Sequence, residues 1–313
     1  AEMKNIKIGT RTVLALLLPL IGLLVFSGIT VMDKYRTATQ MDKVLELAEV
    51  APVISALVHE MQKERGGSAV FISSKGAKFV KELPDQRKLT DDKYAALSST
   101  FSAFDAASFG QSLAAKISDA ESALKDLEGI RGGISGLQIT VPKMAGYYTP
   151  TIGKLLVVVE EMGLLSTDVH VTNLISAYTS FLQGKERAGI ERAMGAAGFG
   201  SGKFAPSIYQ KFLKLIAMQD TFFSRFNISA TQDLQAAFKS TMQGADVDEV
   251  ARLRKIAIDS PATGSLENIE SGYWFAAITK KIELMKSVED KITSSLQATA
   301  AEIEDASHSA YLI

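Results

Sequence analysis

The sequence contains no cysteine, which excludes disulfide bonds and thiolate metal sites. An oxidising compartment is permitted by this absence and is not required by it. Only three histidines occur, His59, His170 and His308, which argues against a histidine-rich metal centre. We therefore expect neither a metal site nor a cofactor.

The chain also lacks an excess of either charge, since 34 lysines and arginines balance 35 acidic residues and the formal net charge is −1. Without a positive excess there is no electrostatic grip on a phosphate backbone. We expect no nucleic-acid partner.

Motifs of enzyme active sites are missing as well. The segment AGFGSGKF, residues 197–204, lacks the Ser or Thr that a phosphate loop needs after its lysine, because Phe204 follows Lys203. His59-Glu60 begins like a zinc-protease helix, but Lys63 stands where the second histidine belongs. With no nucleophile elbow or acid/base pair either, the sequence predicts that the protein is not an enzyme.

One long stretch lacks charge altogether. From Thr12 to Met32 no charged residue occurs, and this run is long enough to cross a bilayer as a helix. Lys4, Lys7 and Arg11 precede it and favour a cytoplasmic start. A cleaved signal peptide is the alternative, but the run is long for one and no A-x-A-like site follows.

This run predicts the organisation of the chain. Residues 1–11 form a cytoplasmic tail that begins with a cloning remnant, Ala1 and Glu2. Residues 12–32 form a transmembrane helix, residues 33–309 a periplasmic helical domain, and residues 310–313 the truncated start of a second transmembrane segment.

Beyond the apolar run, hydrophobic residues recur with helical periodicity and strand patterns are nearly absent, so the fold class is all-α. Pro52 is expected to kink or break the first long helix, and the region around Pro84 to form a loop. Thr90 is expected to cap a helix, and the glycines of GIRGGISG to end the helix that starts near Ser112.

Two segments combine glutamate–arginine pairs with glycine and alanine inside apolar helices: HEMQKERGGSAVF (59–71) and LQGKERAGIERAMGAAGFGSGKF (182–204). Residues three and four apart are neighbours on a helix. By this spacing Arg187 has Glu191 as a local partner, whereas Arg65 and Arg192 have no carboxylate and lie among small residues. A buried, unpaired guanidinium is costly, so either another helix supplies an acid or the site accepts an anion. The spacing leaves both open.

The two segments resemble the nitrate- and nitrite-sensing (NIT) domain family. The resemblance rests on QKERG at 62–66 and KERAGIERA at 185–193 and covers roughly residues 44–285. It implies two packed four-helix bundles that bind nitrate or nitrite between helices carrying Arg65 and Arg192. Arg187 is a weaker candidate, and Gly66 and Gly189 would leave room for so small a ligand.

The opening MKNIKIGTR, residues 3–11, resembles that of a chemoreceptor. We therefore expect the periplasmic sensor of a methyl-accepting chemotaxis receptor in a bacterial inner membrane, and not the RNA-binding type of the family. Such a receptor would be a homodimer, with its cytoplasmic signalling domain outside this chain and ligand binding passed across the membrane as a helix shift. The alternative is a helical structural or partner-binding module without a small-anion ligand.

Overall fold

The computed structural model describes residues 8–311, and every regular element in that range is helical. The all-α prediction is confirmed. The elements are α1 (Ile8–Ser73), α2 (Glu82–Ala103), η2 (Ala106–Phe109), α3 (Gln111–Leu124), α4 (Leu127–Ser135), α5 (Val141–Leu165), α6 (Val169–Gly200), α7 (Pro206–Ser229), α8 (Gln232–Thr241), α9 (Ala245–Thr263) and α10 (Ser271–Tyr311).

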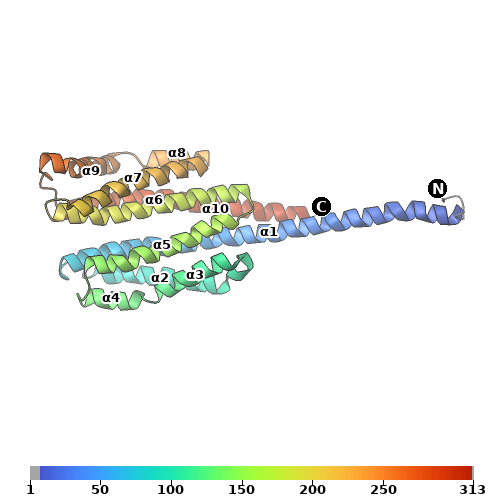
Figure 1. The fold of residues 1–313 in the computed structure, drawn as a ribbon, viewed down its shortest axis with the longest axis horizontal. Helices are drawn as coiled ribbons and strands as arrows, with labels where there is room; N and C mark the ends of the chain where they lie inside the picture. Colours follow the sequence, from blue (N-terminus) through green and yellow to red (C-terminus); the bar gives the residue numbers. More distant parts are fainter. Residues whose placement is uncertain (1–7, 312–313) are drawn as a thin grey trace.

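The helices form two bundles that lie side by side (Figure 1). In the first bundle α1 packs against α2 and α5, and the shorter α3 and α4 follow one another along the remaining position. The second repeats this plan with α6, α7 and α10, and with α8 and α9 in the corresponding place. The bundles meet where α1 packs against α6 and α10, and α5 against α6. This agrees with the expected pair of four-helix bundles.

Helix α1 runs without interruption for 66 residues and contains both Pro19 and Pro52, so the expected break at Pro52 is wrong. A proline inside a helix removes one backbone hydrogen bond. Packing around Pro52 opposes a break, because Ala51 and Ile54 beside it are completely buried. Tertiary contacts therefore outweigh the local preference.

Three other local expectations also fail. Pro84 lies in the first turn of α2, where a missing N–H costs little, and not in a loop. Thr90 lies inside α2, fully buried, and its hydroxyl donates to the carbonyl of Gln86 at 3.2 Å. The glycines of GIRGGISG do not end the helix that starts near Ser112: the first three lie inside α4 and Gly136 is the C-cap of α4, whose Ile134 is completely buried. In each of these segments, burial of one helix face outweighs the local preference of the sequence for a loop, cap or helix end.

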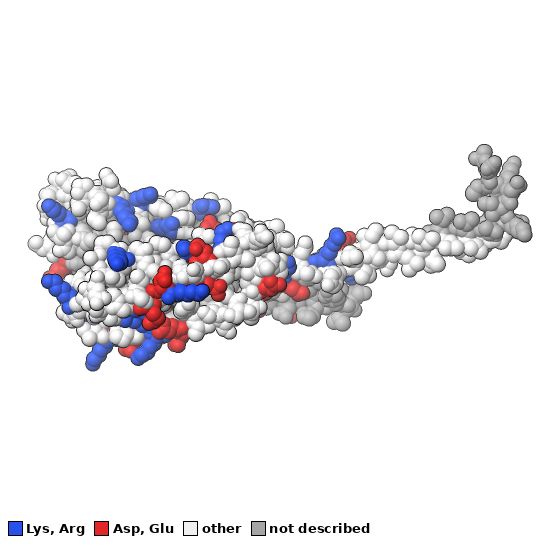
Figure 2. Space-filling model, turned by 60° about the horizontal axis from the view of Figure 1, so that its bottom comes forward, with Lys and Arg blue, Asp and Glu red and all other residues white. Residues whose placement is uncertain are grey.

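The amino-terminal part of α1 extends beyond the bundles (Figure 1). It contains a segment long and apolar enough to cross a membrane by length and composition, none of which is buried. Continuous burial along α1 begins only near Val44. Figure 2 shows this extended stretch as largely free of charged side chains, which gather instead over the bundles. Of the expected terminal segments, residues 1–7 and 312–313 lie outside the described residues, and the remainder is helical.

Candidate anion-binding site

The two motif arginines meet at the interface between the bundles, Arg65 on α1 and Arg192 on α6. Each residue is only 6% exposed. A Cβ atom at Gly66 would lie 2.8 Å from a terminal guanidinium nitrogen of Arg192, and one at Gly189 would lie 2.9 Å from that of Arg65. Each arginine thus crosses the glycine that belongs to the other motif, and only glycine leaves this space free.

Arg65 is fully paired. Its two terminal nitrogens donate to the carboxylate oxygens of Glu186 at 2.6 and 3.1 Å, and one of them also donates to the Thr149 hydroxyl at 2.9 Å. The amide of Gln62 donates to the same carboxylate at 2.8 Å. The acid comes from another helix, which is one of the two outcomes the sequence allowed.

Arg192 has a different environment. It donates to the Thr279 hydroxyl at 3.0 Å, and its guanidinium lies 4.6 Å from the ring centroid of Phe275. No ion pair with a carboxylate is found for it among the described residues. Burial, together with the nearby charge of Arg65, lowers the pKa of Arg192 to about 10, so it is still charged at neutral pH. Glu283 and Glu186 attract its charge, but a buried charge that lacks a directly bonded counter-charge is the less stable arrangement.

The position of Arg192 is fixed by close packing behind it. Gly195 lies one turn further along α6 and is in direct contact with the indole of Trp274 on α10. The indole nitrogen of Trp274 donates to the Arg192 carbonyl at 3.0 Å. A side chain at position 195 would occupy the space of the indole, so glycine sets the distance between α6 and α10 here.

A cavity of about 200 Å³ opens beside Arg192. Its lining includes His59, Gln62, Lys185, Gly189, Arg192 and Phe275. Pockets for drug-sized molecules usually measure roughly 300–1,000 Å³, so this one suits a ligand of a few atoms. It lies where both motifs and α10 converge.

Lys185 and His59 form a buried polar pair in the wall of this cavity. The ammonium group of Lys185 is bonded to the carboxylate of Glu289, and it lies 3.2 Å from Nδ1 of His59. Burial and the adjacent Lys185 charge lower the pKa of His59 to about 2. His59 is therefore neutral, Nδ1 accepts from the ammonium group, and the proton of the ring is left on Nε2.

Charged groups of both signs surround the cavity, since its lining also includes Lys63, Glu82 and Glu283. Among the buried cations nearby, Arg65 is ion-paired with Glu186 and Lys185 with Glu289. Arg192 instead contacts a hydroxyl and an aromatic ring. It is therefore the buried cation of the cavity wall that no carboxylate holds within the described residues.

Arg187 does not contribute to this cavity. It is bonded to Gln183 on its own helix, and its guanidinium lies 4.9 Å from the ring centroid of Phe222. The expected pair with Glu191 is absent, because Glu191 instead receives two hydrogen bonds at 2.7 Å from Arg254. Helical spacing permitted the local pair, but the bundle core offers Glu191 a bidentate partner.

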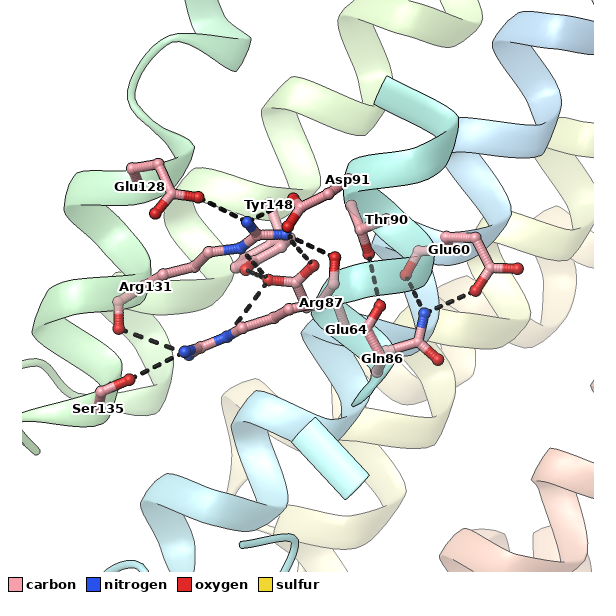
Figure 3. Close-up of polar contacts among 10 residues, drawn as sticks. All are labelled: Glu60, Glu64, Gln86, Arg87, Thr90, Asp91, Glu128, Arg131, Ser135 and Tyr148. Carbon is pink, nitrogen blue, oxygen red and sulfur yellow. Dashed lines mark hydrogen bonds and ion pairs between the residues drawn. The ribbon is translucent and has the colours of Figure 1, made fainter. Parts of the chain in front are cut away.

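The glutamate that precedes each motif arginine points into its own bundle. Glu64 accepts from Arg131 at 2.7 and 2.8 Å and from the Tyr148 hydroxyl at 2.7 Å (Figure 3). Burial alone would raise the pKa of Glu64, but the hydrogen bonds from Arg131 outweigh it and the pKa is lowered. These ion pairs hold α4 on α1 and α9 on α6. In each Glu-Arg pair the acid serves the core and the arginine faces the other bundle.

Sequence reasoning missed several residues of this site. Lys185 and Glu186 lie inside the second motif, but helical spacing along α6 could not show that they bond to α1 and α10. Phe275 and Thr279 lie more than 80 residues beyond Arg192, and nothing in their neighbourhood singles them out. Gln62 belongs to the first motif, which was the one available signal.

With this geometry in hand, the comparisons with known proteins define the class. Residues 56–297 match the family described as nitrate and nitrite sensing. The chain therefore belongs to the nitrate- and nitrite-sensing (NIT) domain family.

One curated protein and one solved structure are similar over most of this chain. The nitrate regulatory protein of Klebsiella oxytoca is 31% identical over 270 residues, which cover 85% of this chain and 66% of that protein. The solved structure of the NasR transcription antiterminator superimposes with a TM-score of 0.81 at 27% identity and covers 91% of this chain and 77% of that one. The chain thus spans just under two thirds of its curated relative.

These relatives correct several expectations. They are a nitrate regulatory protein and a transcription antiterminator, so the interpretation as the periplasmic sensor of a methyl-accepting chemoreceptor in the inner membrane is wrong. The length of an uncharged run indicates only that it could cross a membrane. Basic residues also stand on both sides of this run, with Lys34 and Arg36 after it, so its flanks do not determine its cellular location. The exclusion of a nucleic-acid partner is also wrong, because one relative is a transcription antiterminator. A balanced net charge over the whole chain does not exclude such a partner.

Proposed function

We propose that this chain is the anion-sensing module of a regulatory protein and binds nitrate or nitrite between its two bundles. The observation that carries the proposal is the buried Arg192, which lacks a carboxylate and lines a small cavity. The family and the nitrate regulatory protein point to the same ligand class. These relatives are described as regulatory proteins and not as enzymes.

The chemistry of the cavity suits a flat oxyanion. A guanidinium group presents a planar fork of donors that matches planar oxyanions, and nitrate and nitrite are both planar. Gln62, Thr279 and Nε2 of His59 supply further polar groups at the cavity or its edge. Either ion carries a single negative charge, which the guanidinium of Arg192 can offset.

Binding would change the relation between the bundles. Without a ligand, the like charges of Arg65 and Arg192 oppose close approach of α1 and α6, and a bound anion offsets this repulsion. A ligand shifts an equilibrium by its differential affinity for the two arrangements. Because α1 and α10 both continue out of the bundles together (Figure 1), a small shift at the site would be carried along them to the output of the regulator.

The test is calorimetric titration of the purified chain with nitrate, nitrite, chloride and sulfate. Saturable binding of nitrate or nitrite, with sulfate inert, is expected. Arg192→Ala should abolish it, while Arg252→Ala, which removes an arginine from the exposed face of α9, should not. A folded protein that binds none of these anions would favour the alternative, a helical partner-binding module.

A further inference from the structure

Glu186 occupies the donor fork that an anion would otherwise use. Its carboxylate accepts two hydrogen bonds from Arg65 and one from Gln62, and it is only 2% exposed. Its Oε2 lies 4.0 Å from the place of a Cβ at Gly189, which lines the cavity. A resident negative charge is thus held at the edge of the proposed anion site.

The second bundle contains an equivalent arrangement, whose residues do not line the cavity beside Arg192. Glu191 on the same helix accepts two hydrogen bonds at 2.7 Å from Arg254 and a third at 2.7 Å from the amide of Gln219. There the arginine and glutamine join α9 and α7 to α6. The same donor set therefore stabilises a bundle at Glu191, whereas at Glu186 it lies next to Gly189 of the cavity wall.

Glu186 holds the guanidinium of Arg65, so Arg192 is the one motif arginine that no carboxylate holds within the described residues. A site with one such guanidinium favours a univalent anion, because a divalent anion would bring an uncompensated negative charge into a buried position. Removal of the Glu186 charge would release the second guanidinium, and a divalent oxyanion would then be accommodated. We propose that Glu186 is the specificity-determining residue of the site, where it neutralises Arg65 and restricts binding to univalent oxyanions.

This inference rests on the proposed anion-sensing function. Glu186 should also lower the affinity for nitrate, because its carboxylate and the ligand compete for the donors of Arg65. A close charge pair commonly changes affinity by about tenfold or more. Loss of the competing carboxylate should therefore tighten nitrate binding by at least that factor.

The experiment compares Glu186→Gln with Glu191→Gln in the full chain, and each variant is titrated with sodium nitrate and sodium sulfate. Both substitutions break a buried bidentate pair on α6, so they are matched for their effect on stability. We expect Glu186→Gln to bind nitrate about tenfold more tightly and to gain saturable sulfate binding. Glu191→Gln should keep the wild-type preference.

A second pair of variants covers the case in which Glu186→Gln does not fold. Arg65→Gln leaves the Glu186 carboxylate beside the site without its guanidinium partner and should lose nitrate binding, and Arg65→Gln combined with Glu186→Gln removes that carboxylate charge and should recover it. If Glu186→Gln keeps the wild-type profile, or the double variant recovers nothing, Glu186 only orients Arg65 and the inference is overturned. Absence of nitrate and nitrite binding in the wild-type chain would instead defeat the proposed function itself.

Discussion

Arg65 and Arg192 correspond in the two motifs and differ in what neutralises them. Arg65 is held by Glu186 at 2.6 Å, whereas Arg192 contacts a hydroxyl and an aromatic ring. Because of this difference, we expect both arginines to matter for nitrate binding but Arg65 to matter more for the stability of the fold.

Substitution by alanine should expose this difference. Arg65→Ala strands the buried Glu186 and should lower the free energy of unfolding by about 3–5 kcal/mol, the usual cost of breaking a buried pair. Arg192→Ala removes a charge that has no carboxylate, so its cost should be well below that of Arg65→Ala. Both should lose nitrate binding. Urea unfolding measures the stabilities, and a larger loss for Arg192→Ala would contradict the pairing described.

His59 gives the protein a pH dependence of known sign. Its pKa is about 2 in the folded protein and about 6.5 when unfolded, so below pH 6.5 the unfolded chain binds a proton that the folded chain does not. Stability is full above pH 6.5 and falls as the pH decreases. Between pH 7 and pH 5 this group should account for a loss of about 2 kcal/mol.

The measurement is urea unfolding at pH 7 and pH 5 for the wild type and for His59→Asn, which keeps an oxygen acceptor for Lys185. The variant should lose less stability than the wild type over this interval. Equal losses would mean that His59 takes up its proton in the folded state.

The sequence predicted the surroundings of the motif arginines only as far as local geometry allows. Helical spacing correctly indicated that Arg65 and Arg192 lack acids on their own helices, because residues three and four apart are fixed by the helix itself. It wrongly paired Arg187 with Glu191, because Arg254 competes from another helix. The Glu186 partner of Arg65 depends on how α6 packs on α1, which spacing along one helix does not contain.

At the scale of elements, α6 is the helix that touches every part of the site. It carries Lys185, Glu186 and Arg192, and its Gly195 lies directly against Trp274 of α10. Trp274 is completely buried and its ring also packs against those of Phe199 and Phe212, so it has little freedom to move aside.

Gly195→Ala should therefore destabilise the protein. Overpacking of this kind commonly costs about 1–3 kcal/mol, and the displaced indole would move away from the Arg192 carbonyl and weaken nitrate binding. Gly153→Ala in α5 is the control, because a Cβ there meets nothing within 4 Å and alanine favours a helix by about 1 kcal/mol. Thermal unfolding should show opposite shifts, and a stabilised Gly195→Ala would contradict the close approach.

Helix positions were predicted well where a cap or terminator acts locally. The sequence Thr-Val-Pro at 140–142 predicts a helix start, and Thr140 caps α5 by accepting from the Lys143 N–H. Ser166 or Thr167 is the predicted cap of the following helix, but the cap of α6 is Asp168, a shift of one or two residues. Failures occurred at Pro52, Thr90 and the glycines of α4, where burial against other helices outweighs local propensity.

At the scale of the whole molecule, the two-bundle body and the extended part of α1 are structurally independent. The apolar stretch before Tyr35 is exposed along its described length, so it adds nothing to the core. Its extent and lack of charge could be read directly from the sequence, whereas its cellular context could not. The expected homodimer stays a prediction, since a single chain does not test it.

Deletion of residues 1–36 should therefore leave the thermal midpoint of the bundles and their nitrate affinity unchanged. Removal of that apolar surface should also reduce self-association, because exposed apolar patches of this size favour it. Differential scanning calorimetry and analytical ultracentrifugation would check both. A lowered midpoint would mean that the extended helix stabilises the bundles after all.

The crossed arrangement of Arg65 over Gly189 and Arg192 over Gly66 has an evolutionary consequence. A side chain larger than hydrogen at either glycine would displace the arginine of the opposite motif, so the two positions of each pair cannot diverge separately. Across related chains we expect covariation: where position 66 is not glycine, position 192 should not be arginine, and the same should hold for 189 and 65. A mutation in one bundle is thus selected through its effect on the other, and the two halves of the domain evolve as one unit.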